Sequence, residues 1–206
     1  QFNSAYSSFS LNFDSASSDH IFVNTSVLSG LSTASISMWL NIDSISATRG
    51  ILSLSDGAVN DEITLSTFNS RLYVRIRNAS TNFKYSSDWA SQSANTWIHL
   101  CLVYDGSEVE TDRIKVYLNN SLINFGSVTG STPVTLPTFT QLTIGNDIDG
   151  NDFEGKIDEV SIFNKKLNQA EITSIYNNGY PKDITALSPI SWHRLGEDAY
   201  FNGNDF

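Results

Sequence analysis

A chain of 206 residues is long enough for one large β domain or for two smaller domains. Its 40% hydrophobic and 12% aromatic residues exclude a disordered chain, and the absence of any apolar run near about 18 residues argues against membrane insertion. The formal net charge of −10 excludes nucleic acid as an expected partner, which needs a basic surface, and favours calcium or a cationic partner.

Short alternating segments, separated by turns rich in Ser, Asn and Gly, occupy most of the chain. In each segment apolar and polar residues alternate, which is the period of a half-buried strand. The expected strands are residues 11–13, 21–23, 34–40, 50–54, 63–68, 72–77, 97–104 and 114–118. Residues 126–137, with Pro133 and Pro137, are expected to form a crossing loop. This spacing predicts an all-β sandwich or barrel.

A strand, an acidic turn and a longer strand follow the crossing loop. Residues 142–144 alternate like a strand, and residues 146–152 consist of turn-forming residues. The alternation then resumes over residues 153–163. In this frame Asp158 lies on the same face as Val160 and Ile162, which makes it a charged residue on an apolar face.

A short helix is expected near residues 168–178. Asn168 can cap it, and Glu171 three residues later completes a capping box. Gly179 and Pro181 then end it.

The chain is expected to be one domain over residues 1–181. Residues 182–206 begin apolar and become polar, so we expect either a C-terminal tail or the truncated start of a further module. Because the chain starts at Gln1 without a charged, apolar leader, we expect a processed chain or a fragment. The single cysteine, Cys101, excludes an internal disulfide framework.

Several short motifs, taken in order over about residues 8–180, together resemble one family. The stretches are ASISMWL at 34–40, WIHL at 97–100 with YDG at 104–106, KVYLNN at 115–120, and FEGKIDEVSIFNK at 153–165. They resemble the laminin G-like domains of the concanavalin A-like lectin/glucanase superfamily. The resemblance implies a two-sheet antiparallel jelly-roll sandwich on a secreted, cell-surface or virion protein. The C-terminal residues resemble segments that follow such domains in phage structural proteins.

Asp158 is the first candidate ligand of a metal ion. An ionised carboxylate buried alone costs several kcal/mol, so it needs a cation or a good set of donors. The resemblance implies a structural calcium ion at Asp158, with Asp14 and Asp19 as weaker candidates because the N-terminal strand supplies the partner loop in related domains. The alternative is an aspartate hydrogen-bonded to the N-terminal backbone or paired with an arginine.

The expected carbohydrate site lies where loops meet. Trp89 matches no core position of the family, and it sits with Tyr85 near a loop rich in Ser and Asn, so its ring is a candidate surface for stacking on a sugar. Asp147, Asp149 and Asn151 are candidate hydrogen-bond or calcium partners, although a solvated turn is the alternative reading of that stretch.

One face of the expected strand at 71–77 carries Arg71, Tyr73, Arg75 and Arg77. Such a face can bind a sulfated, sialylated or uronic glycan, because guanidinium groups match carboxylates and sulfates. We favour the alternative, a sheet face paired with neighbouring acids.

The sequence favours a non-catalytic module. A retaining glycosidase needs two carboxylates about 5 Å apart, and no E-x-D-x-x-E motif occurs. No G-x-S-x-G motif occurs either, and His99 matches a core position of the family. The expected function is recognition of a glycan. The alternative is a purely structural module, such as a capsid decoration or fibre domain, that acts through a protein partner, a homo-oligomer or a larger particle. A glycoside hydrolase or lyase ranks last.

Overall fold

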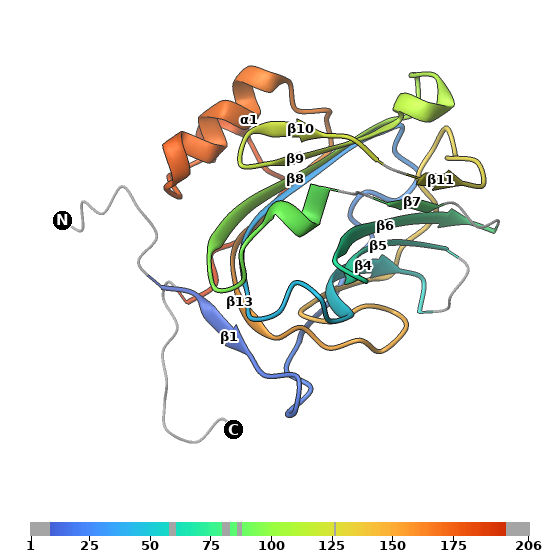
Figure 1. The fold of residues 1–206 in the computed structure, drawn as a ribbon. Helices are drawn as coiled ribbons and strands as arrows, with labels where there is room; N and C mark the ends of the chain where they lie inside the picture. Colours follow the sequence, from blue (N-terminus) through green and yellow to red (C-terminus); the bar gives the residue numbers. More distant parts are fainter. Residues whose placement is uncertain (1–8, 58–60, 80–82, 86–87, 126, 197–206) are drawn as a thin grey trace.

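The computed structural model describes residues 9–57, 61–79, 83–85, 88–125 and 127–196. These residues form two seven-stranded antiparallel sheets, packed face to face, and a single α-helix (Figure 1). The predicted all-β sandwich with one short helix is confirmed. Within the described ranges, no helix is long and apolar enough to cross a membrane.

We call the first layer sheet A. Its order is β1–β13–β3–β8–β9–β10, and β14 pairs with the edge of β13 that β1 also uses. Its strands are β1 (Leu11–Phe13), β3 (Thr33–Ile42), β8 (Trp97–Asp105), β9 (Ile114–Leu118), β10 (Ser121–Ile123), β13 (Gly155–Phe163) and β14 (Ser191–His193).

We call the second layer sheet B, with the order β11–β7–β6–β5–β4–β12–β2. Its strands are β2 (Ile21–Asn24), β4 (Arg49–Ser55), β5 (Asp61–Phe68), β6 (Arg71–Asn78), β7 (Phe83–Tyr85), β11 (Ser127–Thr129) and β12 (Gln141–Ile144). The predicted crossing loop at 126–137 thus contributes β11, a short edge strand, before it crosses.

The core lies between the sheets and is built from alternate residues of each strand. In β3 the inward residues include Ile36, Met38 and Leu40, which are almost fully buried. In sheet B they include Leu65 of β5 and Val74 of β6. Because alternate side chains point to opposite faces, the residues between these positions face outward from the sandwich.

A bulge in β13 changes which of its residues face the core. The pairing of β13 with β3 shifts between Asp158 and Ser161, and Glu159 has a φ of 52°. As a result Ile157 and Val160 both point into the core, and Asp158 lies on the outer side beside Trp39. The prediction that Asp158 shares the inner face with Val160 is wrong, because the extra residue reverses the alternation.

The helix α1 (Gln169–Tyr176) covers part of the outer face of sheet A (Figure 1). The predicted capping box is present: the Asn168 side chain accepts from the Glu171 N–H, and the Glu171 carboxylate accepts from the Asn168 N–H. Ile172 and Ile175 pack in one cluster with Cys101, among other residues. Single turns of 3-10 helix are η1 (Asp88–Ser91), η2 (Glu110–Asp112), η3 (Asn177–Gly179) and η4 (Thr185–Leu187).

Residues 184–195 belong to the same sandwich. Ile184 packs in the cluster under α1, Leu195 reaches the main core, and β14 extends sheet A. The Trp192 indole also donates to the Glu159 carboxylate. The predicted boundary at residue 181 therefore does not separate these residues from the domain, while residues 197–206 lie outside the described part.

Candidate functional site

A cavity of about 420 Å³ lies on the outer face of sheet B, and we call it the sheet B pocket. The end of β5, the start of β6 and the loop at residues 146–152 meet there, because the hairpin between β5 and β6 brings alternate outward residues together. The lining residues are Thr48, Ser66, Phe68, Tyr73, Arg75, Asp147, Asp149 and Asn151.

The loop at 146–152 forms one wall, and Asp147 holds its shape. The Asp147 carboxylate accepts from the N–H of Asp149 at 3.1 Å and from the N–H of Asn151 at 2.9 Å. The Asn151 side-chain amide also donates to both of its oxygens. Asp147 is only 4% exposed, and burial raises the pKa of its carboxyl group. Asp147 is therefore a structural part of the wall.

The same wall rests directly on the backbone of β4. The Gly50 N–H donates to the Asn151 carbonyl at 3.1 Å. A Cβ at position 50 would lie 2.3 Å from that oxygen and 2.3 Å from the Asp147 nitrogen. Only glycine permits this approach, so Gly50 fixes how closely the loop approaches the sheet.

Arg75 forms the floor and joins the loop to the sheet. Its guanidinium contacts the carboxylate of Glu62, a fully buried residue, and reaches Asp149 at 2.7 Å. Arg77 lies 3.6 Å from the same Glu62 carboxylate. Burial raises the pKa of Glu62 above its ordinary 4.5, although the two guanidinium groups oppose that rise. The favoured interpretation, arginines paired with neighbouring acids, is confirmed for Arg75 and Arg77.

Two aromatic rings complete the pocket. The Phe68 side chain stands at the open end of β5 and is 42% exposed. The Tyr73 ring has the Arg75 guanidinium carbon 5.8 Å from its centroid, which is within cation–π range. The site thus offers aromatic rings beside fixed hydrogen-bonding groups, with Arg75 paired to acidic side chains.

The structure brings together three of the five predicted sugar-binding residues, Asp147, Asp149 and Asn151. The prediction for Trp89 is wrong: η1 turns this segment inward, and the indole is fully buried in the core. Tyr85 lies in β7, and its side chain is outside the described part of the structure. The sequence reasoning missed Phe68, whose signal is a large apolar residue that continues the polar face of Thr64 and Ser66.

The three predicted metal ligands do not form one site. β1 and β13 are antiparallel, with Leu11 opposite Ile157 and Phe13 opposite Gly155. Asp14 therefore lies past one end of this pair and Asp158 past the other, about 13 Å apart at 3.3 Å per residue. Asp14 and Asp19 instead bond within their own turn. Within the described residues, no three His, Cys, Asp or Glu side chains gather as a metal cluster.

A buried Ser–His pair resembles part of a catalytic site but lacks access. Ser37 Oγ lies 2.8 Å from His99 Nε2, and the two residues are 1% and 0% exposed. The His99 ring packs beside Trp39 and Tyr176. Among described residues no hydrogen-bond partner reaches its Nδ1, and burial lowers its pKa to about 3. His99 is a core residue, as the sequence predicted.

Comparisons with known proteins agree with this architecture. The sequence profile of the Laminin_G_3 family, described as "Concanavalin A-like lectin/glucanases superfamily", matches residues 14–173, which is more than half of the chain. No curated protein sequence matches the chain significantly.

Three solved structures illustrate the similarity in fold. Domain 4 of AbnA, an extracellular arabinanase from Geobacillus stearothermophilus in complex with arabinotriose, aligns with a TM-score of 0.59 and 17% identity over 76% of this chain and 71% of that one. The CBM40 of the Ruminococcus gnavus IT-sialidase, bound to α2,3-sialyllactose, aligns with a TM-score of 0.57 and 14% identity over 77% of this chain and 98% of that one. Domains LG4-5 of the mouse laminin α1 chain align with a TM-score of 0.59 and 12% identity over 91% of this chain and 46% of that one.

Proposed function

Because the chain belongs to the concanavalin A-like lectin/glucanase superfamily, we propose that it is a non-catalytic module that binds carbohydrate in the sheet B pocket. Two similar domains, from AbnA and from the IT-sialidase, were solved with an oligosaccharide bound. At their low identity this likeness concerns the fold alone, and the pocket of this chain is what supports the proposal.

The observation that carries the proposal is the exposed Phe68 ring beside the Arg75–Asp149 pair in one cavity. Sugars present an apolar ring face and a rim of hydroxyl groups, and pockets for small ligands combine apolar walls with a few fixed polar groups. The volume of about 420 Å³ lies within the range of about 300–1,000 Å³ typical of such pockets.

The charges of the pocket favour a neutral glycan. Glu62 and Asp149 compensate Arg75, and Glu62 also compensates Arg77, so no guanidinium there is left for a sulfate or carboxylate alone. The remaining capacity of Asp149 and Asn151 suits hydroxyl groups, which both donate and accept.

The state of the carboxylates supports a non-catalytic role. A glycosidase needs one carboxyl group as acid and a second as base or nucleophile. In the sheet B pocket Asp147 is occupied by the turn that it holds, and Asp149 by Arg75. Both carboxylates therefore have structural partners within the site.

The test is a glycan-array screen of the wild type, Phe68→Ala and a control, Phe22→Ala. Phe22 is 51% exposed and lies on β2, outside the pocket. If stacking on Phe68 is as strong as base–aromatic stacking, its loss should cost about 1–3 kcal/mol, or about one to two decades in Kd. Both variants should melt like the wild type. Unchanged binding by Phe68→Ala to every glycan that the wild type binds would refute the proposed site.

The proposal extends to location and to the alternative role. We propose that the domain acts outside the cell or on a cell or virion surface; its likeness to a domain of an extracellular arabinanase supports this. The alternative, a structural spacer, would be favoured by a large apolar surface patch or by ordering of residues 184–206 against another chain. Residues 184–195 pack on their own sandwich. Calcium at Asp158, with backbone oxygens as further ligands, stays a prediction.

A further inference from the structure

A second cavity, of about 340 Å³, lies on the outer face of sheet A, and we call it the sheet A pocket. It lies where α1 has ended and the chain continues through Gly179 to Pro181, so the helix no longer covers the strands. Its principal walls are Phe9, Trp39, Trp97, Tyr180, Lys156 and Asp158. It shares no lining residue with the sheet B pocket, the proposed carbohydrate site.

Aromatic side chains gather around the sheet A pocket and remain open to solvent. Trp97 is 40% exposed, Tyr180 63% and Phe9 65%. Trp97 begins β8 and points outward because its neighbour Ile98 points into the core. Exposed aromatic side chains that cluster around a cavity mark a binding site more strongly than single exposed residues do.

The base of the pocket is rigid. Trp39 is 3% exposed, and its ring stacks on Tyr176 of α1 with centroids 6.0 Å apart and an angle of 15° between the planes. His99 packs against the same indole at 5.2 Å. A ring fixed in this way loses little freedom when a ligand covers it, which lowers the entropic cost of binding.

The charged groups select the class of ligand. Lys156 is exposed and Asp158 is 3% exposed, and both line the pocket from β13, on either side of the inward-facing Ile157. An aromatic pocket with a carboxylate alone would suit an organic cation. Lys156 opposes a cation, and Asp158 opposes an anion. A donor and an acceptor beside flat rings suit the hydroxyl groups and the apolar face of a neutral sugar.

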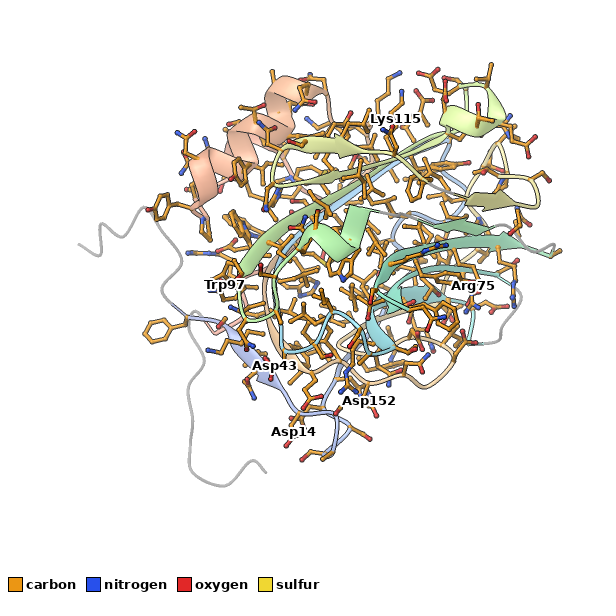
Figure 2. All side chains as sticks on the ribbon, viewed as in Figure 1. Asp14, Asp43, Arg75, Trp97, Lys115 and Asp152 are labelled. Atoms are coloured by element: carbon orange, nitrogen blue, oxygen red, sulfur yellow. The ribbon has the colours of Figure 1, made fainter. Side chains whose placement is uncertain are left out.

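We propose that the sheet A pocket is a second carbohydrate site, for a neutral sugar unit, which makes the module bivalent. This rests on the proposed function in expecting a glycan ligand, but it uses separate residues. Arg75 and Trp97 lie on opposite sides of the molecule, one on each sheet (Figure 2). Two sites facing apart engage two glycan segments at once and raise the avidity for a dense glycan surface.

The experiment titrates arabinotriose, cellohexaose and xylohexaose, which are neutral oligosaccharides, into the wild type, Trp97→Ala, Phe68→Ala and Leu122→Ala. Leu122 is the control, since it is 53% exposed on β10 and lies outside both pockets. The sheet A pocket is lined by Trp39 and Trp97, and no tryptophan lines the sheet B pocket. Tryptophan fluorescence therefore reports binding in the sheet A pocket, and calorimetry counts the sites in both pockets.

We expect a saturable fluorescence change in the wild type, Phe68→Ala and Leu122→Ala, and a loss of affinity of at least tenfold at this site in Trp97→Ala. Calorimetry should give two sites in the wild type and one in each pocket variant. A wild type with one site, removed by Phe68→Ala, would overturn this proposal and keep the proposed function. One site removed by Trp97→Ala alone would reject the sheet B pocket instead.

Two further outcomes would also overturn the proposal. One is the absence of any fluorescence change with all three oligosaccharides. The other is a homodimer in sedimentation velocity that Trp97→Ala dissociates, because the exposed rings would then serve a protein contact.

Discussion

Replacement of Arg75 by methionine tests the charge network under the sheet B pocket. The substitution keeps most of the apolar stem and removes the guanidinium from Glu62, which is fully buried. Removal of one partner from a buried ion pair costs about 3–5 kcal/mol, because the other charge stays buried without compensation. Arg77 remains 3.6 Å from Glu62 and compensates part of that charge, so we expect about 3 kcal/mol.

The Asp149 contact adds little to this value. The Asp149 side chain is 46% exposed, and ion pairs open to solvent contribute about 0–1 kcal/mol. For a chain of this size a loss of about 3 kcal/mol corresponds to a fall of about 6–12 °C in Tm. Urea unfolding at neutral pH measures the free energy directly, and Arg71→Met, an exposed change on the same strand face, should stay within about 0.5 kcal/mol of the wild type.

A second substitution and the pH dependence test the same charge network. Glu62→Gln in the Arg75→Met background removes the uncompensated charge and should recover most of the loss. The pKa of Glu62 is already raised above 4.5 by burial, and loss of Arg75 raises it further. A raised folded-state pKa adds stability as the pH falls towards 4.5, so the deficit of Arg75→Met should shrink in acid. A loss below about 1 kcal/mol, or a double variant no more stable than Arg75→Met, would refute the network.

Two further predictions concern pH and metal. The pKa of His99 is lowered by burial from 6.5 to about 3, so stability should fall as the pH drops from 6.5 towards 3, by up to about 1.4 kcal/mol per pH unit from this group. Urea unfolding over that range should show that the free energy of unfolding falls less steeply with pH in His99→Gln than in the wild type. Equal pH dependence in the two proteins would contradict the lowered pKa of His99. If Asp158 binds calcium, chelation should lower the Tm of the wild type and leave that of Asp158→Ala unchanged. If the chelator leaves the Tm of both proteins unchanged, a calcium ion at Asp158 is excluded.

Local patterns in the sequence predicted much of the fold. The alternation of apolar and polar residues located most strands, and Asn168 with Glu171 located the start of α1, because both signals depend on neighbours along the chain. The face predicted for Asp158 was wrong because the bulge depends on the pairing of β13 with β3, and the sequence around Glu159 carries no local pattern that indicates it. Residues 184–195 were assigned outside the domain because their partners, such as β13, lie far away in sequence.

The candidate site was predictable only in part, for a related reason. The acidic loop was found because Asp147, Asp149 and Asn151 are adjacent in sequence. Trp89 was misplaced because the direction in which a loop turns depends on the sheet below it, and the buried indole packs in the core. Phe68 was missed because it lines a pocket only together with the loop at residues 146–152, which is distant in sequence.

The wall of the sheet B pocket is fastened by backbone at Gly50 and by the Asp147 carboxylate. Asp149 and Gly150 at the tip of the loop are exposed, and the Asp149 side chain adds only its pair with Arg75 to that fastening. Substitutions at the tip can therefore change the groups presented to a ligand while the frame stays in place. If the module binds glycans in this pocket, as proposed, changes in glycan preference should begin at position 149, with glycine retained at position 50.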